Sequence, residues 1–461
     1  MEESLRFTVR RKSPELLVPA GPTPRELKRL SDIDDQEGLR RHTHNIQFFH
    51  HDASINGRDP ATVLRDAVAR ALVHYYPFAG RLRELQGRKL AVDCTGEGVL
   101  FIEADADVRL EQFGHALHPP FPGIEELVFD VPGSSEVLGT PLLLFQVTRL
   151  SCGGFILAVR VNHTMTDAQG LMQFLTAVAE LARGAAVPSV RPVWGREVLE
   201  ARNPPCPSFV HRQYDEVPDT KGAIVPLEDM EQHSFFFGAK EVASVRSHLT
   251  PVLQKHATTF DVLVGLLWKC RTIALAPHAD EEMRMMFAVD GRGRKGKQSA
   301  IPTGYYGNVV ALPAAVSAAG ELCAMPLSYA VRLVKEAKEE VDMEYMRSVA
   351  DPLVQRGRPD ITMVRAYMAS DVTKVGFGEL DYGWGRPVYA GPAMVATICS
   401  FLIPFKNANG EDGIIITICL PGHTLDTGPV LRFWGPGAKV RIWAPLEKFY
   451  IPRYKFNKGG G

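Results

Sequence analysis

Apolar side chains in the first part of the chain recur at the spacing of an amphipathic helix. Between residues 61 and 76 they return every three or four positions, which places them on one helical face. Asp59 and Pro60 stand immediately before this segment, and an acidic residue followed by proline is typical of a helix start. Pro77 and Gly80 then break the pattern. We therefore predict a helix over 61–76.

Two apolar runs further along the chain have the character of buried strands. They span residues 141–150 and 154–161, and the Ser-Cys-Gly-Gly segment at 151–154 is typical of a hairpin turn. Helical spacing returns over residues 168–183. The pattern therefore predicts a strand, a tight loop and a helix in succession around His163.

A stretch without a clean period, from about 184 to 226, separates two patterned halves. It is rich in proline and is typical of a long linker. Beyond it the pattern predicts a helix (260–275), a strand (283–289), a long helix (327–354) and two strands (394–404 and 413–420). We predict an N-terminal domain over 1–185, a crossover linker over 186–225 and a C-terminal domain over 226–461.

Composition places the chain among soluble globular proteins. It has 461 residues, a formal net charge of −1, 45% hydrophobic residues and 23% charged residues. A balanced charge gives no general attraction to nucleic acid or to an anionic membrane, so we expect neither as a partner. No apolar run reaches the ~18 residues of a membrane span. An anionic ligand must therefore be met by a local site.

Cysteine usage and the chain ends favour the cytoplasm. The seven cysteines are odd in number and none lies within three residues of another, which argues against a disulfide framework or a CxxC metal site. The first residues lack the apolar core of a signal peptide. The chain ends in Lys-Gly-Gly-Gly and not in a Ser-Lys-Leu type peroxisomal address. We expect a cytoplasmic protein, with the peroxisome as the open alternative.

The first candidate for chemistry is the segment His163-Thr164-Met165-Thr166-Asp167. His163 ends a predicted strand, and ligands gather at such sheet edges in α/β proteins. A neutral imidazole, with an ordinary pKa of ~6.5, can accept a proton at neutral pH, and Asp167 could orient the ring or hold the loop. With fourteen histidines, however, a His with an Asp four positions later is expected roughly once by chance.

Two glycine-containing loops are further candidates. In Asp381-Tyr382-Gly383-Trp384-Gly385 the glycines suggest a tight turn and the tryptophan an apolar anchor, so a structural role is favoured. The basic loop 290–297 could meet phosphate, but it lacks the GxxxxGK[ST] spacing of a P-loop and is as often a solvated turn.

Other site classes find little support. His42, His44, His50, His51 and Asp52 cluster like metal ligands, but residues 45–49 between them have the pattern of a strand, so we expect no metal site. The GxSxG turn of the α/β-hydrolases is absent.

The two motifs together resemble those of the plant BAHD acyltransferases. HTMTD (163–167) and DYGWG (381–385) both match that family, and the combination is more specific than either motif. Further matching phrases are PTPRELKRLSDIDDQEGLR (22–40), YYPFAGRLRE (75–84), LAVRVNHTMTDAQGL (157–171), PVWGRE (192–197), GYYGN (304–308), YMRSVAD (345–351), SDVTKVGFGELDYGWG (370–385) and IPFKNANGEDG (403–413). The resemblance covers roughly residues 5–420, and it is strongest to alcohol acyltransferases of the benzyl alcohol benzoyltransferase type.

The resemblance implies a fold and an activity. The fold would be α/β, with two similar-sized domains of the chloramphenicol-acetyltransferase-like topology, mixed sheets flanked by helices and a channel between the domains. The activity would be transfer of a benzoyl or similar acyl group from acyl-CoA, as co-substrate, to an alcohol such as benzyl alcohol, which forms an ester. The family further implies a monomer without a permanently bound cofactor.

The resemblance also assigns residues. His163 matches the family's general base, and Asp167 matches an aspartate that points away from substrate and pairs with an arginine, here Arg292. We group Asp381 with them as a catalytic-motif residue, although the family places its loop away from the proton transfer. Gly383, Trp384 and Gly385 would support that loop, and Ser370 matches a hydroxyl near the reaction centre.

Departures from the family keep alternatives open. Tyr382 stands where the family usually has phenylalanine, 391–401 looks shortened, and the tail after Leu420 lacks the usual closing helix. The alternatives are a transferase with a hydroxycinnamoyl donor or an amine acceptor, an inactive ligand-binding relative, and a hydrolase. Activity with pairs of CoA thioesters and acceptors would separate them.

Overall fold

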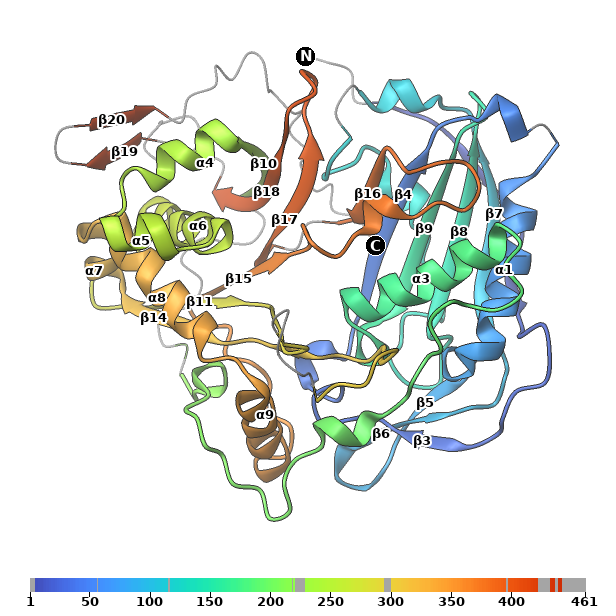
Figure 1. Ribbon diagram of the computed structural model, residues 1–461, viewed down its shortest axis with the longest axis horizontal. Coiled ribbons are helices and arrows are strands. Elements are labelled where there is room, and N and C mark those ends of the chain that lie inside the picture. Colours follow the sequence, from blue (N-terminus) through green and yellow to red (C-terminus); the bar gives the residue numbers. More distant parts are fainter. Residues whose placement is uncertain are drawn as a thin grey trace.

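The computed structural model describes residues 5–55, 57–114, 117–217, 219, 229–293, 300–394, 397–421, 432–435 and 438–441. In this part of the chain two large β-sheets lie side by side, and helices pack against each of them (Figure 1). Each sheet mixes parallel and antiparallel strand pairs. The predicted α/β fold class, with mixed sheets and flanking helices, is confirmed.

The first sheet has seven strands, and one of them ends directly before His163. In spatial order these are β1 (Val9–Arg11), β7 (Val99–Ala106), β8 (Leu143–Leu150), β9 (Phe155–Asn162), β4 (His42–Phe49) and β16 (Tyr389–Pro392), while β2 (Glu15–Leu17) also pairs with β7. The predicted hairpin is β8 and β9. Every residue of β9 is buried, because both of its faces are covered, and this explains its continuous apolar run.

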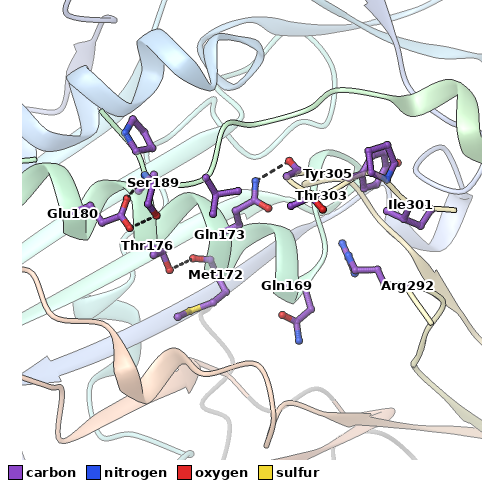
Figure 2. A pocket seen from close by; sticks show the side chains of 15 residues that line it. Gln169, Met172, Gln173, Thr176, Glu180, Ser189, Arg292, Ile301, Thr303 and Tyr305 are labelled. Carbon is purple, nitrogen blue, oxygen red and sulfur yellow. Dashed lines mark hydrogen bonds between the residues drawn. The ribbon is translucent and has the colours of Figure 1, made fainter. Parts of the chain in front are cut away.

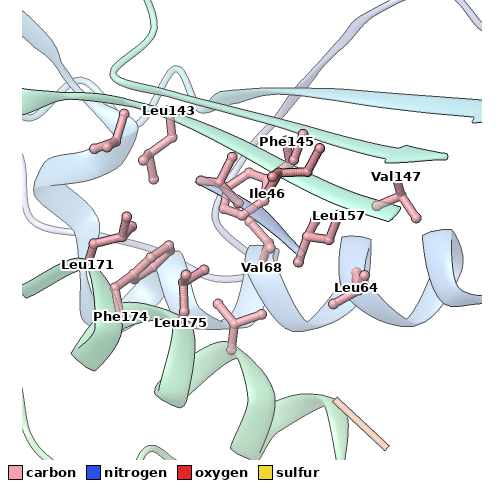
Figure 3. Packing of buried hydrophobic residues seen from close by; sticks show 14 of the residues in the cluster. Ile46, Leu64, Val68, Leu143, Phe145, Val147, Leu157, Leu171, Phe174 and Leu175 are labelled. Atoms are coloured by element: carbon pink, nitrogen blue, oxygen red, sulfur yellow. The ribbon is translucent and has the colours of Figure 1, made fainter. Parts of the chain in front are cut away.

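Two helices cover one face of this sheet, α1 (Pro60–His74) and α3 (Ala168–Ala182). The Asp59 carboxylate accepts a hydrogen bond of 2.9 Å from the Thr62 amide, so α1 begins where the sequence predicts. Figure 3 shows Leu64 and Val68 of α1 and Phe174 of α3 packed toward side chains of the sheet. This core fixes the position of α3, which follows directly from the His163 segment.

Smaller elements complete the first half of the chain. A three-stranded sheet consists of β3 (Leu27–Arg29), β6 (Leu90–Asp93) and β5 (Arg81–Glu84), and α2 (Ile124–Leu127) is a single turn. The predicted linker stays irregular where it is described. It contains the short 3-10 helices η7 (Arg196–Leu199) and η8 (Arg212–Tyr214).

The second sheet has six strands in the order β10 (Met230–Gly238), β18 (Asp412–Pro421), β17 (Cys399–Lys406), β15 (Ala366–Asp371), β11 (Glu282–Phe287) and β14 (Ala314–Ala318). Its helices are α4 (Ala239–Arg246), α5 (Pro251–His256), α6 (Thr259–Leu275), α7 (Ala319–Ala324), α8 (Leu327–Glu339) and α9 (Met343–Gln355). Two further strand pairs are β12 (Val289–Asp290) with β13 (Val310–Ala311), and β19 (Arg432–Gly435) with β20 (Ala438–Arg441).

The single long helix predicted over 327–354 is two helices, so that prediction is wrong in this detail. α8 ends at Glu339 and α9 begins at Met343. The Asp342 carboxylate accepts hydrogen bonds of 2.9 Å from the amides of Glu344 and Tyr345, so it caps a new helix and ends the earlier one. Apolar spacing continues through the break, which is why the pattern did not reveal it.

The two halves of the sequence share the first sheet. β16 comes from the second half, yet it pairs antiparallel with β4, as the orange strand beside the blue one in Figure 1 shows. Sheet membership therefore does not follow the order of the chain. The boundaries at 185/186 and 225/226 and the channel between the domains stay predictions.

Parts of two sequence predictions lie outside the described residues. The basic loop 290–297 is described only as far as Gly293, and most of the tail after Leu420 is not described. Among the helices that the structure describes, none is both long and apolar enough to cross a membrane.

Candidate active site

His163 stands at the point where β9 ends. A short 3-10 helix, η6 (His163–Met165), follows the strand, and the Asn162 side chain accepts hydrogen bonds from the Thr164 amide (3.2 Å) and hydroxyl (2.7 Å). The His163 amide donates to the carbonyl of Arg41, beside the start of β4, at 2.8 Å. Residues 163–167, here called the His163 loop, are therefore fixed at a sheet edge.

The imidazole of His163 is half-buried and is not enclosed in a core. Its Nδ1 is buried and makes no hydrogen bond of normal geometry with the described groups. Burial lowers the pKa of His163, the positive charge of Arg41 lowers it further, and the charge of Asp167 acts in the opposite direction. The ring is therefore neutral at neutral pH and can accept a proton.

Asp167 holds the loop and does not orient the imidazole. Its Oδ1 accepts hydrogen bonds from the Gly170 amide (2.9 Å) and Arg292 (3.0 Å), and its Oδ2 accepts from the Val309 amide (2.9 Å) and Arg292 (2.8 Å). These four bonds occupy both oxygens, and none of the described hydrogen bonds joins Asp167 to the His163 ring. Of the two roles considered for Asp167, the structure shows the second.

Arg292 ties the second half of the chain to this loop. Besides its bidentate pair with Asp167, it donates to the carbonyl of Gly307 at 2.8 Å and to the Asp290 carboxylate at 3.1 Å. The pairing expected between Asp167 and Arg292 is thus present. It joins the start of α3 to residues that follow β12.

A second buried ion pair supports the backbone of the His163 loop. Asp34 is fully buried and pairs with Arg196 at 3.0 Å, and Arg196 also donates to the carbonyl of Met165 at 2.8 Å. The Asn308 side chain donates to Asp34 and to the carbonyl of His163, both at 2.9 Å. Residues from three segments that are far apart in the sequence therefore hold the carbonyl groups of His163 and Met165 in place.

The sequence analysis assigns no role to Asp34, Arg196 or Asn308, although each lies in a phrase that matches the family. An aspartate among other acidic residues has the appearance of a surface group. Its burial depends on partners more than 100 positions away, and a single sequence does not show them. The only available signal was the match of the phrases themselves.

The Asp381–Gly385 segment is a self-contained loop. The Asp381 carboxylate accepts hydrogen bonds from the amides of Gly383 (2.7 Å) and Gly385 (3.0 Å), whose φ angles are 105° and 76°. Such φ angles favour glycine, as the sequence indicated. Arg183, just after α3, donates to the Asp381 carbonyl.

Trp384 anchors this loop to the sheet and to neighbouring residues. Its ring meets Phe155 of β9 edge-on at 5.4 Å, and the Arg58 guanidinium lies 5.4 Å from its centre. Arg58 also donates to the carbonyl of Ala182, the last residue of α3, at 3.0 Å. The loop therefore binds the C-terminal end of α3.

The structure separates Asp381 from His163. The His163 loop precedes the first turn of α3, and Asp381 contacts the residue that follows its last turn. A helix of 15 residues is about 22 Å long, so the two residues lie at opposite ends of it. Asp381 thus lies apart from His163, and its part in the reaction stays a prediction.

Ser370 lies on β15, paired in register with Phe401 of β17. It is half-buried, and among the described residues no hydrogen bond joins it to His163. Its role near the reaction centre stays a prediction.

A pocket of about 410 Å³ lies along α3, between the linker and residues 301–305. Figure 2 shows Glu180 at one end and Arg292 at the other. The polar groups that line it bind one another: Glu180 accepts from Ser189, and Gln173 donates to the carbonyl of Gly304. Among the described residues no group of three or more His, Cys, Asp or Glu is placed to hold a metal ion.

Comparison with known proteins decides the family. Residues 7–427 match the Transferase family, which comprises the BAHD acyltransferases. The chain belongs to this family. The chain is 57% identical to the benzyl alcohol O-benzoyltransferases of Nicotiana tabacum and of Petunia hybrida, over 91% of its length and 92% of theirs. It is 52% identical to alcohol acyltransferase 16 of Actinidia chinensis, over 91% of each chain.

Solved structures share the BAHD fold. Vinorine synthase superposes with a TM-score of 0.69 at 21% identity, over 92% of this chain and 97% of that one. F. graminearum TRI101, crystallised with coenzyme A and deoxynivalenol, superposes with a TM-score of 0.64 at 17% identity, over 87% and 96%. The predicted family and enzyme class, an acyl-CoA-dependent O-acyltransferase, are confirmed.

Proposed function

We propose that this BAHD acyltransferase transfers a benzoyl or similar acyl group from acyl-CoA to benzyl alcohol or a related alcohol, with His163 as the general base. The observation that carries the proposal is the neutral, half-buried imidazole, fixed where β9 gives way to α3. The 57% identity to two benzyl alcohol O-benzoyltransferases supports the substrates.

The reaction needs no covalent enzyme intermediate. The imidazole of His163 takes the hydroxyl proton as the alcohol oxygen attacks the thioester carbonyl carbon. The tetrahedral intermediate then releases the thiolate of CoA, and the imidazolium returns the proton to the sulfur. The products are an ester and free CoA, and the imidazole regains its starting state.

The neighbouring residues keep the base in place. Asp167 and Arg292 close the His163 loop from one side, and Asn308 with Arg196 hold its carbonyl groups from the other. Holding two substrates against a fixed base lowers the barrier by at most about 7–11 kcal/mol. Ser370 is our candidate for the hydroxyl that meets the carbonyl oxygen. The enzyme would work as a monomer without a resident cofactor.

The test is a matrix of donors and acceptors run with two variants. Benzoyl-CoA, acetyl-CoA and a hydroxycinnamoyl-CoA are each combined with benzyl alcohol, a short aliphatic alcohol and an amine, and esters and free thiol are measured. We expect benzyl benzoate as the main product. His163→Ala should lower kcat by roughly 10²–10⁴-fold, with an unchanged circular dichroism spectrum.

Exposed His256 supplies the matched control, because His256→Ala removes an imidazole far from the His163 loop in the sequence. Asp167→Asn should lower both activity and melting temperature, since it disturbs a buried ion pair. A near-wild-type rate for His163→Ala would refute the assigned base. Preference for an amine or a hydroxycinnamoyl donor, or thiol release without an acceptor, would replace the proposed substrates or reaction.

A further inference from the structure

Arg41 is the neighbour of His163 across the edge of the first sheet. β4 and β9 pair antiparallel, and the last pair in register at this end is His42 and Asn162. The next pair outward is Arg41 and His163, joined by the amide-to-carbonyl hydrogen bond of 2.8 Å. Arg41 and His163 lie just beyond the ends of the two strands, so their backbones are adjacent at this edge of the sheet.

The guanidinium of Arg41 has no anionic partner in the part of the chain that the structure describes. It is exposed, and no hydrogen bond or ion pair is made by its side chain. The preceding residue differs: Arg40 pairs with Asp35 at 2.8 Å and with Glu84 at 2.5 Å. Arg41 thus carries a positive charge that none of the described residues neutralises by an ion pair.

The other charged groups around the His163 loop are arranged in pairs. On the side of α3, Asp167 is matched by Arg292, which also binds the exposed Asp290. On the side of the linker, Asp34 is matched by Arg196. Asn308, which donates to the carbonyl of His163 from the second half, is uncharged.

Among the described residues, the unmatched charge at the loop is therefore that of Arg41. The positive charge of Arg41 lowers the pKa of His163, and it acts against the burial that raises the pKa of Cys399 to about 12. Cys399 is the first residue of β17, so the charge of Arg41 also acts on a group of the second sheet.

We propose that Arg41 is a positioning residue for acyl transfer: its guanidinium keeps the His163 imidazole uncharged before the alcohol reacts, and makes the imidazolium a stronger acid toward the departing thiolate. The proposal rests on the proposed role of His163. A nearby cation disfavours the imidazolium electrostatically, so loss of the cation makes protonation of the free enzyme easier. No bond is made or broken at Arg41 itself.

The sign of the expected pH effect follows from this. The acidic limb of kcat/KM reports protonation of the essential base in the free enzyme. Because Arg41 lowers the pKa of His163, Arg41→Gln should move that limb to higher pH, and Arg41→Glu should move it further. Arg41→Lys keeps the charge and should restore the wild-type limb. Arg10→Gln, at an exposed arginine of β1, is a control with the same change in net charge.

Two measurements test the proposal on the full-length enzyme. The first is kcat/KM against pH for the four variants with benzoyl-CoA and benzyl alcohol. The second is the pH dependence of diethyl pyrocarbonate modification at His163, followed by mass spectrometry of its peptide, because the reagent attacks the neutral ring and needs no turnover. We expect both profiles to shift in the order Lys, Gln, Glu, and Arg10→Gln to match wild type.

Unshifted modification profiles in Arg41→Gln and Arg41→Glu would overturn the role of Arg41, whatever the activity. An active His163→Ala variant, in contrast, would overturn the proposed function and not the electrostatic effect. The exposed side chain makes loss of folding an unexpected result, because the bond to the His163 amide uses the Arg41 backbone. A modification profile that shifts without any change in kcat/KM would show that the charge acts on His163 but not on catalysis, and would also reject the proposal.

Discussion

The hydroxyl group of Tyr382 lies in the core, where the Gln47 side chain is a polar neighbour but makes no hydrogen bond of normal geometry with it. The aromatic ring itself is well placed, since it meets Phe49 edge-on at 5.7 Å. Burial raises the pKa of Tyr382 well above its ordinary value, so the phenol is never ionised near neutral pH. A buried hydroxyl that bonds to nothing costs about 1–3 kcal/mol.

Tyr382→Phe should therefore stabilise the fold by about 1 kcal/mol, because it removes the unsatisfied hydroxyl and keeps the ring. The melting temperature, measured by differential scanning calorimetry, should rise slightly. Tyr75→Phe is the matched control, since its hydroxyl accepts a 3.2 Å hydrogen bond from Gln173 and its loss should be destabilising. A lower melting temperature for Tyr382→Phe would show that its hydroxyl is satisfied in solution.

Single residues also mark the limit of what the sequence can tell. His163 and Asp167 can be recognised in the sequence because their motif, HTMTD, directly follows the end of a predicted strand. Asp34 does not, because Asp32 and Asp35 beside it look the same in the sequence. Which aspartate meets Arg196 is decided by packing between segments that are far apart along the chain.

At the scale of elements, the break between α8 and α9 depends on one side chain. The Asp342 carboxylate satisfies two amides at the start of α9, and no other acidic side chain in the described part of the chain bonds to these amides. Without it the first turn of α9 would keep unsatisfied donors.

Asp342→Ala should accordingly lower the free energy of unfolding by about 1 kcal/mol. Asp342→Ser should recover most of the loss, since a serine hydroxyl can accept the same bond. Thermal or urea unfolding of both variants measures the difference. Equal stability of the alanine and serine variants would mean that the cap contributes little.

Elements with strong local signals were predicted well. The hairpin of β8 and β9 has a glycine turn between apolar runs, and α1 has Asp59 and Pro60 at its start. β16 was not predicted, because Tyr-Ala-Gly-Pro shows no strand period and its partner lies more than 300 positions away. Local chemistry therefore revealed the elements, while their pairing across the chain depended on contacts that a sequence pattern does not contain.

At the scale of the whole molecule, buried histidines make stability depend on pH. Burial lowers the pKa of His211 to about 4, against its hydrogen bond to Ser348, and burial with the charge of Arg160 lowers the pKa of His42 to about 4. The unfolded chain, with an ordinary histidine pKa of ~6.5, binds more protons between these values. Stability is therefore lost as the pH falls from about 6.5 to 4.

The melting temperature should fall between pH 7 and pH 5, with each buried histidine contributing at most about 1.4 kcal/mol per pH unit. His211→Gln, whose amide can still bond to Ser348, should make this fall smaller, and His256→Gln at an exposed position should not. Melting curves at the two pH values measure the difference. An unchanged pH dependence in His211→Gln would contradict the assignment.

The pairing of β16 with β4 has a consequence for synthesis on the ribosome. β4, β9 and α3 emerge early, but the strand that covers the edge of β4 emerges only after more than 200 further residues. At ordinary rates of translation this delay is on the order of tens of seconds. During that time the nascent chain carries an eight-residue strand with uncapped amides and carbonyls, five of whose side chains end up buried. Until Tyr389–Pro392 has been synthesised, this edge of β4 is open to pairing with another chain.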